Sequence, residues 1–100
     1  MDREKNFIKH ITNEVYKMLV LKEREDCGEN VYLEDYINNL FIEIDGACIW
    51  SDWLKRHEDY VVVTSIIAHL SKNNLEYKQY RREIFKMLNL LNKIDAEIEV

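Results

Sequence analysis

The most apolar stretch of the chain, residues 47–71, carries its apolar side chains at helical spacing. Charged residues such as Lys55, Arg56 and Glu58 lie mostly off the stripe that these side chains form. The stripe consists of Trp50, Trp53, Leu54, His57, Tyr60, Val61, Thr64, Ile67, Ala68 and Ser71. Because the stripe is broad, the pattern predicts a central helix near residues 48–71 that packs against more than one neighbour.

One part of this stretch also has the composition of a strand. The run from Tyr60 to Ile67, YVVVTSII, is dense in β-branched residues, which favour strands and lose rotamer freedom in helices. A buried strand is therefore the alternative for this run. The stripe, however, stays in phase from Trp50 to Ala68, and no Gly or Pro interrupts it. We therefore predict a helix.

The same periodicity predicts three further helices. They lie near residues 2–26, 31–45 and 75–97. The chain has no Pro and only two Gly, so Gly28 and Gly46 are the predicted ends of the first two helices. Four helices with short connections place sequence neighbours antiparallel, which predicts an all-α fold, a single-domain bundle over residues 1–100.

Two boundaries depend on polar residues instead of Gly. Ser51 is an alternative N-cap for the third helix, which would leave residues 47–50 as a connection. Asn73 and Asn74 predict the break before the last helix, because Asn tolerates a left-handed turn and also caps helices.

The last helix has the most regular pattern in the chain, an apolar position every three or four residues. This heptad seam is Tyr77, Tyr80, Ile84, Met87, Leu91, Ile94 and Ile98. Three heptads are short for an independent coiled coil, so we predict a helix within the bundle, with a homodimer along this seam as the alternative. The predicted centre of the core is Trp50, Leu54, Val61, Ile67, Ile84 and Leu91.

Composition excludes several classes of protein. Apolar residues at 47% and charged residues at 33% argue against a disordered chain, and no apolar run reaches the length of about 18 residues that a membrane span needs. The start, MDREKNF, lacks the apolar segment of a signal peptide, so we expect a cytoplasmic protein. The two Cys and three His lack metal-binding spacing, and the sequence predicts two free thiols, no metal site and no cofactor.

Negative charge is concentrated in one region. Between Glu23 and Asp45 eight carboxylates stand against Arg24 alone, a net charge of −7 within a chain whose total is −5. Aromatic residues among carboxylates are typical of a surface that binds a basic protein, because the rings anchor and the charges steer the encounter. The predicted partner-binding residues are Glu25, Asp26, Glu29, Tyr32, Glu34, Asp35 and Tyr36. The alternative is a solvated face that keeps the protein soluble.

The last helix has the opposite bias. Five basic residues against Glu83 give a net charge of +4 between Lys78 and Lys93. Such a stripe can contact phosphate, but the acidic total charge and the lack of a helix-turn-helix signature argue against nucleic acid. We expect these side chains to pair with the acidic second helix.

Two groups of residues have the chemical types needed for catalysis. Arg3 and His10 have the R-x6-H spacing that is similar to that of some helical ribonucleases of the HEPN type, in which the pair usually lies well inside a helical bundle. Here the pair lies at the start of the sequence. His57, Glu58 and Asp59 also bring acid–base groups together, but on the apolar stripe a packed, hydrogen-bonded histidine is the expected role.

We therefore expect a small acidic protein-binding module and assign no catalytic residue. An inhibitor or immunity-type protein that neutralises a basic partner, a toxin or a host enzyme, fits by size and charge, as an analogy of class only. The alternative is a nucleic-acid-associated regulator that uses the basic stripe of the last helix. A small helical ribonuclease is the third hypothesis.

Overall fold

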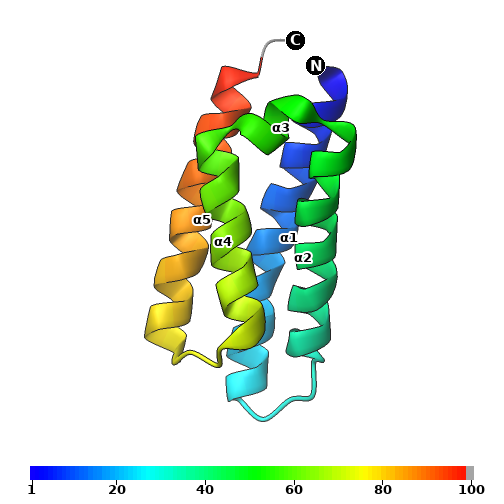
Figure 1. Cartoon of the computed structure of the whole chain (residues 1–100). Helices are drawn as coiled ribbons and strands as arrows, with labels where there is room; N and C mark the ends of the chain where they lie inside the picture. The colour runs from blue at the N-terminus through cyan, green and yellow to red at the C-terminus, as the bar shows by residue number, and fades with distance from the viewer. Residues whose placement is uncertain (99–100) are drawn as a thin grey trace.

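The computed structural model describes residues 1–98, and the fold over this range is all-α, as predicted (Figure 1). Its five helices are α1 (Asp2–Asp26), α2 (Leu33–Trp50), α3 (Asp52–Arg56), α4 (Glu58–Lys72) and α5 (Tyr77–Glu97). No strand occurs within this range, so the β-branched run of α4 is helical. Helices account for 86% of the residues that the structure describes, in agreement with the predicted all-α fold.

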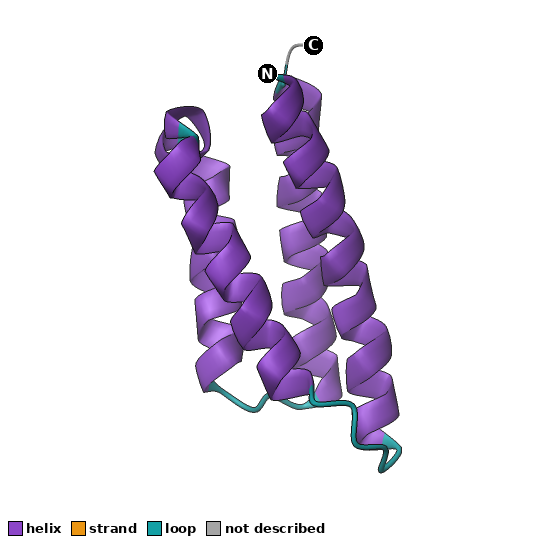
Figure 2. Ribbon diagram, turned by 90° about the vertical axis from the view of Figure 1, so that its right-hand side faces the viewer, coloured by secondary structure: helices purple, strands orange, loops and turns teal. Residues whose placement is uncertain are grey.

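The four long helices form an antiparallel bundle of two layers, α1 with α5 and α2 with α4 (Figure 2). The bundle is elongated, at 42 × 22 × 19 Å. Met1, α3 and the last turn of α5 lie at one end, which we call the terminal end. The connections 27–32 and 73–76 lie at the other, which we call the loop end (Figure 1).

One continuous apolar core runs along the bundle, and each long helix contributes to it at helical spacing. In α1 the fully buried side chains are those of Ile8, Ile11, Val15 and Met18. Because these positions recur every three or four residues, they form a single stripe that faces α2 and α5. The predicted core residues Leu54, Ile67, Ile84 and Leu91 are all buried.

The predicted central helix is wrong, because residues 47–71 belong to three helices. The chain leaves helical geometry at Ser51 and again at His57, where the backbone is extended. Each residue caps the next helix with its own side chain: Ser51 Oγ accepts from the Leu54 N–H, and His57 Nδ1 accepts from the Asp59 N–H. The alternative cap at Ser51 is therefore confirmed, although residues 47–50 are helical and complete α2.

The predicted boundary at Gly46 is also wrong. Gly46 lies inside α2, and of the two glycines only Gly28 has a positive φ, +93°. A single Gly costs a helix only about 1 kcal/mol relative to Ala. Ile44 and Ala47, on either side, are fully buried, and their packing keeps the helix continuous.

The two interruptions also shift the phase of the apolar stripe. Val61, predicted to be in the core, is 50% exposed, whereas Val63 and Ile66 are buried. Trp50 is only partly buried and packs at the edge of the core, with its ring edge-on to Phe7. The predicted stripe was continued through Ser51 and His57, which are not helical. It therefore predicted the wrong face of α4 to be buried.

The heptad seam of α5 lies inside the bundle. Six of its seven residues are buried, and Tyr77 is partly buried. The seam is therefore part of the chain's own core. No helix within residues 1–98 is both long and apolar enough to cross a membrane.

Candidate functional site

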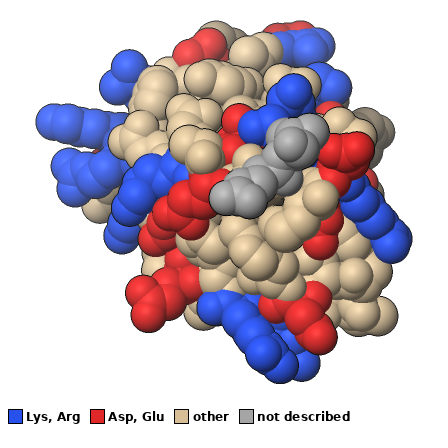
Figure 3. Space-filling view, turned by 90° about the horizontal axis from the view of Figure 1, so that it is seen from above, with Lys and Arg blue, Asp and Glu red and all other residues tan. Residues whose placement is uncertain are grey.

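The structure brings the predicted acidic residues together at the loop end. Glu25 and Asp26 end α1, Glu29 lies in the connection, and Glu34 and Asp35 lie in the first turn of α2. All five are exposed. We call these residues, together with Tyr32, the acidic surface. At the terminal end, Lys and Arg side chains lie among Asp and Glu (Figure 3).

Some of this charge is balanced locally and some is not. The ammonium of Lys22 lies 3.3 Å from Asp26 and 3.8 Å from Glu25, and the guanidinium of Arg24 is 3.2 Å from Glu29. Glu34 and Asp35 form no ion pair with any residue that the structure describes. Their negative charges interact favourably with the partial positive charge at the N-terminus of α2. This structural role leaves both carboxylates open to solvent.

Tyr32 has the least favourable backbone geometry in this part of the chain. Its φ of 53° and ψ of 43° are left-handed, the one such conformation at a non-glycine residue between residues 1 and 98. A left-handed conformation costs a residue with a Cβ roughly 1–2 kcal/mol. The ring is 68% exposed, so internal packing offsets little of this cost. Strain of this kind is concentrated at functional sites in proteins.

Tyr36, also predicted to bind the partner, has a different environment. Its ring packs against the core, and its hydroxyl donates to Glu14, to the backbone carbonyl at 2.9 Å and to the carboxylate. This hydrogen bond lowers the pKa of Glu14, and burial raises the pKa of Tyr36. Tyr36 therefore joins α1 to α2 and does not belong to the acidic surface.

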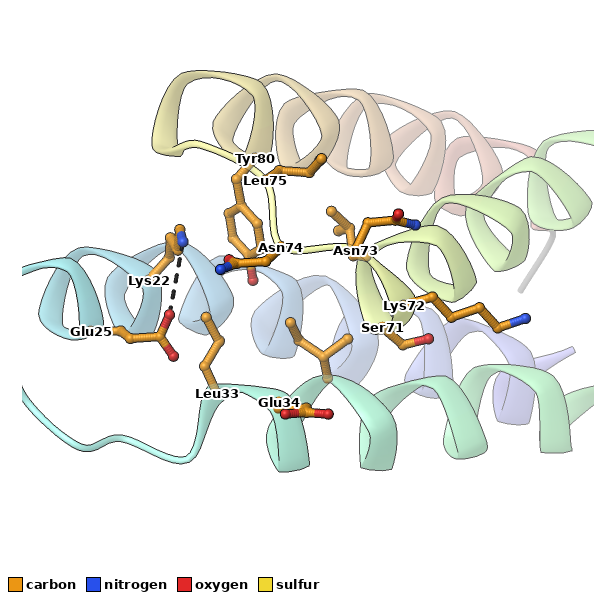
Figure 4. A pocket seen from close by; sticks show the side chains of 12 residues that line it. Lys22, Glu25, Leu33, Glu34, Ser71, Lys72, Asn73, Asn74, Leu75 and Tyr80 are labelled. Carbon is orange, nitrogen blue, oxygen red and sulfur yellow. Dashed lines mark ion pairs between the residues drawn. The ribbon is translucent and has the colours of Figure 1, made fainter.

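Sequence reasoning missed a cavity that opens beside the acidic surface (Figure 4). Its volume is about 280 Å³, and side chains from α1, α2, α4, α5 and the connection 73–76 line it. Tyr80 of α5 points into it, is only 3% exposed, and has a hydroxyl without a hydrogen-bond partner in residues 1–98. In the sequence Tyr80 was an ordinary seam position, so only the fold reveals the unpaired hydroxyl.

The terminal end holds a second cluster that the sequence did not predict, His57, Asp59 and Glu97, whose ligand-type atoms lie within 4.8 Å of one another. His57 Nδ1 accepts from a backbone N–H and is therefore unprotonated, so in the neutral ring Nε2 carries the proton that it donates to Glu97. A metal ion would need the lone pair of Nε2 and would remove this bond. The ring also packs on Trp53, at 5.0 Å between centroids, so His57 is the packed histidine that the stripe predicted.

The remaining candidate residues are Arg3 and His10, which contact α2, and the basic residues of α5. Arg3 stacks over Trp50, 4.0 Å from the ring centroid, and His10 Nε2 lies 3.1 Å from Glu43. The predicted pairing of the basic stripe with the second helix is wrong, because α2 and α5 lie diagonally across the bundle. Four of the basic residues line a shallow surface depression around Phe85, and Lys93 lies 3.6 Å from Asp59 of α4.

The chain matches no known protein family, and no curated protein or solved structure is similar enough to it to count as a match.

Proposed function

We propose that the protein is a small binding module that recognises a basic protein through its acidic surface. Tyr32 is the anchor of this surface, and Glu25, Asp26, Glu29, Glu34 and Asp35 surround it with negative charge. An inhibitor or immunity-type protein that neutralises a basic toxin or host enzyme would work in this way. The proposed setting of this module is the cytoplasm.

The observation that carries the proposal is the exposed ring of Tyr32 on a left-handed backbone. Gly or Asn would form this turn at lower cost, and no packing of the ring within the bundle accounts for a tyrosine. A tyrosine supplies large contact area with few rotatable bonds, which suits it to anchor an interface. A residue that lowers the stability of the fold and exposes such a ring fits a role in binding.

The carboxylates contribute mainly to the rate and selectivity of binding. Glu34 and Asp35 have no cationic neighbour in ion-pair range among the described residues, so their field extends into solvent. Charges at the rim of an interface raise the association rate and set the orientation of the encounter, with little effect on dissociation. Salt concentration is therefore expected to change the association rate, and the Tyr32 ring is expected to set the dissociation rate.

The test measures binding of variants to the partner that wild-type protein captures from host lysate. Glu34→Lys with Asp35→Lys is expected to slow association by tenfold or more at low salt, roughly the range of electrostatic steering. Tyr32→Ala is expected to raise the dissociation rate by about tenfold or more, as for an anchor residue. Surface plasmon resonance at two salt concentrations separates the two effects.

A matched control comes from the other end of the bundle. Asp52→Lys with Glu58→Lys makes the same change in net charge, also at exposed positions in first helical turns, but at the terminal end. This double variant is expected to associate at nearly the wild-type rate. Equal slowing by both double variants would mean that only net charge matters, and unchanged association in the first would reduce the carboxylates to a solubility role.

A further inference from the structure

Two buried tyrosines of this bundle differ in one respect, the state of the hydroxyl. Tyr60, near the terminal end, donates to the backbone carbonyl of Ile44. Tyr80, equally enclosed, has no partner for its hydroxyl within residues 1–98, although its side chain lines the cavity of the loop end. A buried polar group without a partner destabilises the fold. Burial also raises the pKa of Tyr80, so the hydroxyl keeps its proton and remains a donor.

The ammonium of Lys22 is a second donor at the cavity wall. Its side chain is only 6% exposed, and its nitrogen lies 5.6 Å from the centroid of the Tyr80 ring. The nearest carboxylate oxygen, from Asp26, is 3.3 Å away, and no described residue accepts a hydrogen bond from the ammonium. Tyr80 and Lys22 therefore form a donor pole that suits a carboxylate.

The rest of the wall is mixed: apolar and acidic side chains stand beside a second cation, Lys72, and the polar side chains of Ser71, Asn73 and Asn74. Leu33 and Ile37 of α2 and Leu70 of α4 provide apolar surface. Glu34 enters the lining from α2, whereas the donor pole comes from α1 and α5 (Figure 4). The cavity therefore offers a donor pole, an acceptor pole and apolar surface within one volume of about 280 Å³. That volume is just below the usual range for small-molecule pockets, roughly 300–1,000 Å³, so only a small ligand fits.

We propose that this cavity binds a free α-amino acid with an apolar side chain. The carboxylate of the ligand accepts from the Tyr80 hydroxyl and the Lys22 ammonium. The ammonium of the ligand pairs with Glu34, and the side chain packs on Leu33, Ile37 and Leu70. This site is separate from the binding of a basic protein, and neither proposal depends on the other.

The charges around the cavity favour a zwitterion over a purely anionic or a purely cationic ligand. An anionic ligand would be attracted by the donor pole but repelled by the carboxylates of the acidic surface, which lie at the same end of the bundle. A cationic ligand would be repelled by the Lys22 ammonium and would offer no acceptor to the Tyr80 hydroxyl. A zwitterion satisfies both poles and brings no net charge.

The experiment titrates the wild-type chain with leucine and follows backbone amide resonances by NMR. We expect saturable shifts at Leu33, Ile37 and Tyr80, with Ala47 unaffected. The titration extends to about 10 mM, because small ligands whose contacts are not optimal bind only in the millimolar range. Absence of saturable shifts in this range would overturn the proposal and leave water as the partner of the Tyr80 hydroxyl.

Three analogues test the poles on the wild-type chain, without any variant. Leucinamide lacks the carboxylate, N-acetylleucine lacks the ammonium, and glycine lacks the apolar side chain. Each is expected to bind about tenfold more weakly than leucine or worse, the loss typical of a contact with a charged group or of a buried side chain. If leucinamide or N-acetylleucine binds as tightly as leucine, the two-pole arrangement is wrong.

Tyr80→Phe removes the unpaired hydroxyl and keeps the ring, and Tyr60→Phe is its matched control. Tyr80→Phe is expected to fold with at least wild-type stability and to bind leucine about tenfold more weakly or worse. Tyr60→Phe is expected to lower stability and leave leucine binding unchanged. Binding of leucine by Tyr80→Phe at wild-type strength would overturn the proposal.

Discussion

The two ends of the bundle satisfy their polar groups to different degrees. At the terminal end Ser51 caps α3 and donates to Glu4, and His57 caps α4 and donates to Glu97. The buried Asp95 oxygen, which lacks a hydrogen bond within residues 1–98, still lies 3.4 Å from the Lys5 ammonium. Side chains distant in sequence therefore join the helices that meet at this end.

The loop end has few such contacts. Neither Tyr32 nor Glu76, which precede α2 and α5, caps its helix with its own side chain. Tyr32 has a strained backbone, and the Tyr80 hydroxyl has no hydrogen-bond partner among residues 1–98. A cavity also opens between the helices at this end. Proteins retain costs of this kind where a site needs them. The comparison indicates that the terminal end supports the fold and that the loop end is the place to search for function.

The largest expected effect compares two leucines, one from each end. Leu54 of α3 is fully enclosed, and Leu33 of α2 is 5% exposed on the cavity wall. Leu54→Ala is expected to cost about 2–5 kcal/mol in the free energy of unfolding, and Leu33→Ala about 1–2 kcal/mol, because the cavity already removes part of its contacts. Urea denaturation measures both. Equal losses would show that the loop end is packed as tightly as the terminal end.

The next prediction compares the residues before two helices. Ser51→Ala removes an N-cap and should cost about 0.5–2 kcal/mol. Tyr32→Gly relieves the left-handed strain and should raise stability by roughly 0.5–1 kcal/mol, after the extra entropy of Gly in the unfolded chain. Thermal unfolding should therefore shift in opposite directions. A destabilised Tyr32→Gly variant would mean that the ring supports the fold, which would weaken the case for binding.

The two glycines give a smaller contrast. A Cβ at either position would meet no atom within 4 Å, but Gly28 has a φ of +93° and Gly46 is helical. Gly46→Ala should stabilise the protein by about 0.5–1 kcal/mol, whereas Gly28→Ala should destabilise it by about 1 kcal/mol through backbone strain. Chemical denaturation of both variants measures the difference. A destabilised Gly46→Ala would reveal crowding that the structure does not show.

The smallest effect lies between the two ends, where Tyr36 donates to Glu14. The hydrogen bond lowers the pKa of Glu14 from its usual 4.5, so the ionised carboxylate favours the folded state. This contribution is present above the unfolded pKa and is lost as pH falls through the folded one. Tyr36→Phe should cost about 1 kcal/mol in the free energy of unfolding near neutral pH, and the gap to wild type should narrow as pH falls below 4.5. A gap independent of pH would assign the loss to the backbone acceptor alone.

The periodicity predicted most of the fold because helices in a bundle bury one face. α1 and α5 were predicted almost to the residue, since their stripes run without interruption. The break at His57 was not predicted, and the break at Ser51 was predicted only as an alternative. A turn that keeps apolar residues near the core has the same sequence pattern as a continuing helix. The capping His57 was the missing signal, because a histidine is rarely expected to supply an N-cap.

The candidate site was only partly predictable. Charge density located the acidic surface, because the carboxylates are close together in sequence. The separation of Tyr32 from Tyr36 depends on tertiary contacts, since both stand among the same charges. The cavity requires side chains from four helices and the connection 73–76, and no local pattern encodes that meeting.

The position of Met1 beside the last turn of α5 has a mechanical consequence (Figure 1). A force that pulls these two ends apart would load the antiparallel pair α1 and α5 as a zipper, beginning at the contact of Lys5 with Asp95. The contacts would break one after another toward the loop end, where Tyr77 donates to Glu23 at 2.6 Å. The bundle is thus compliant along this direction, and the acidic surface and the cavity are the last parts to bear the load.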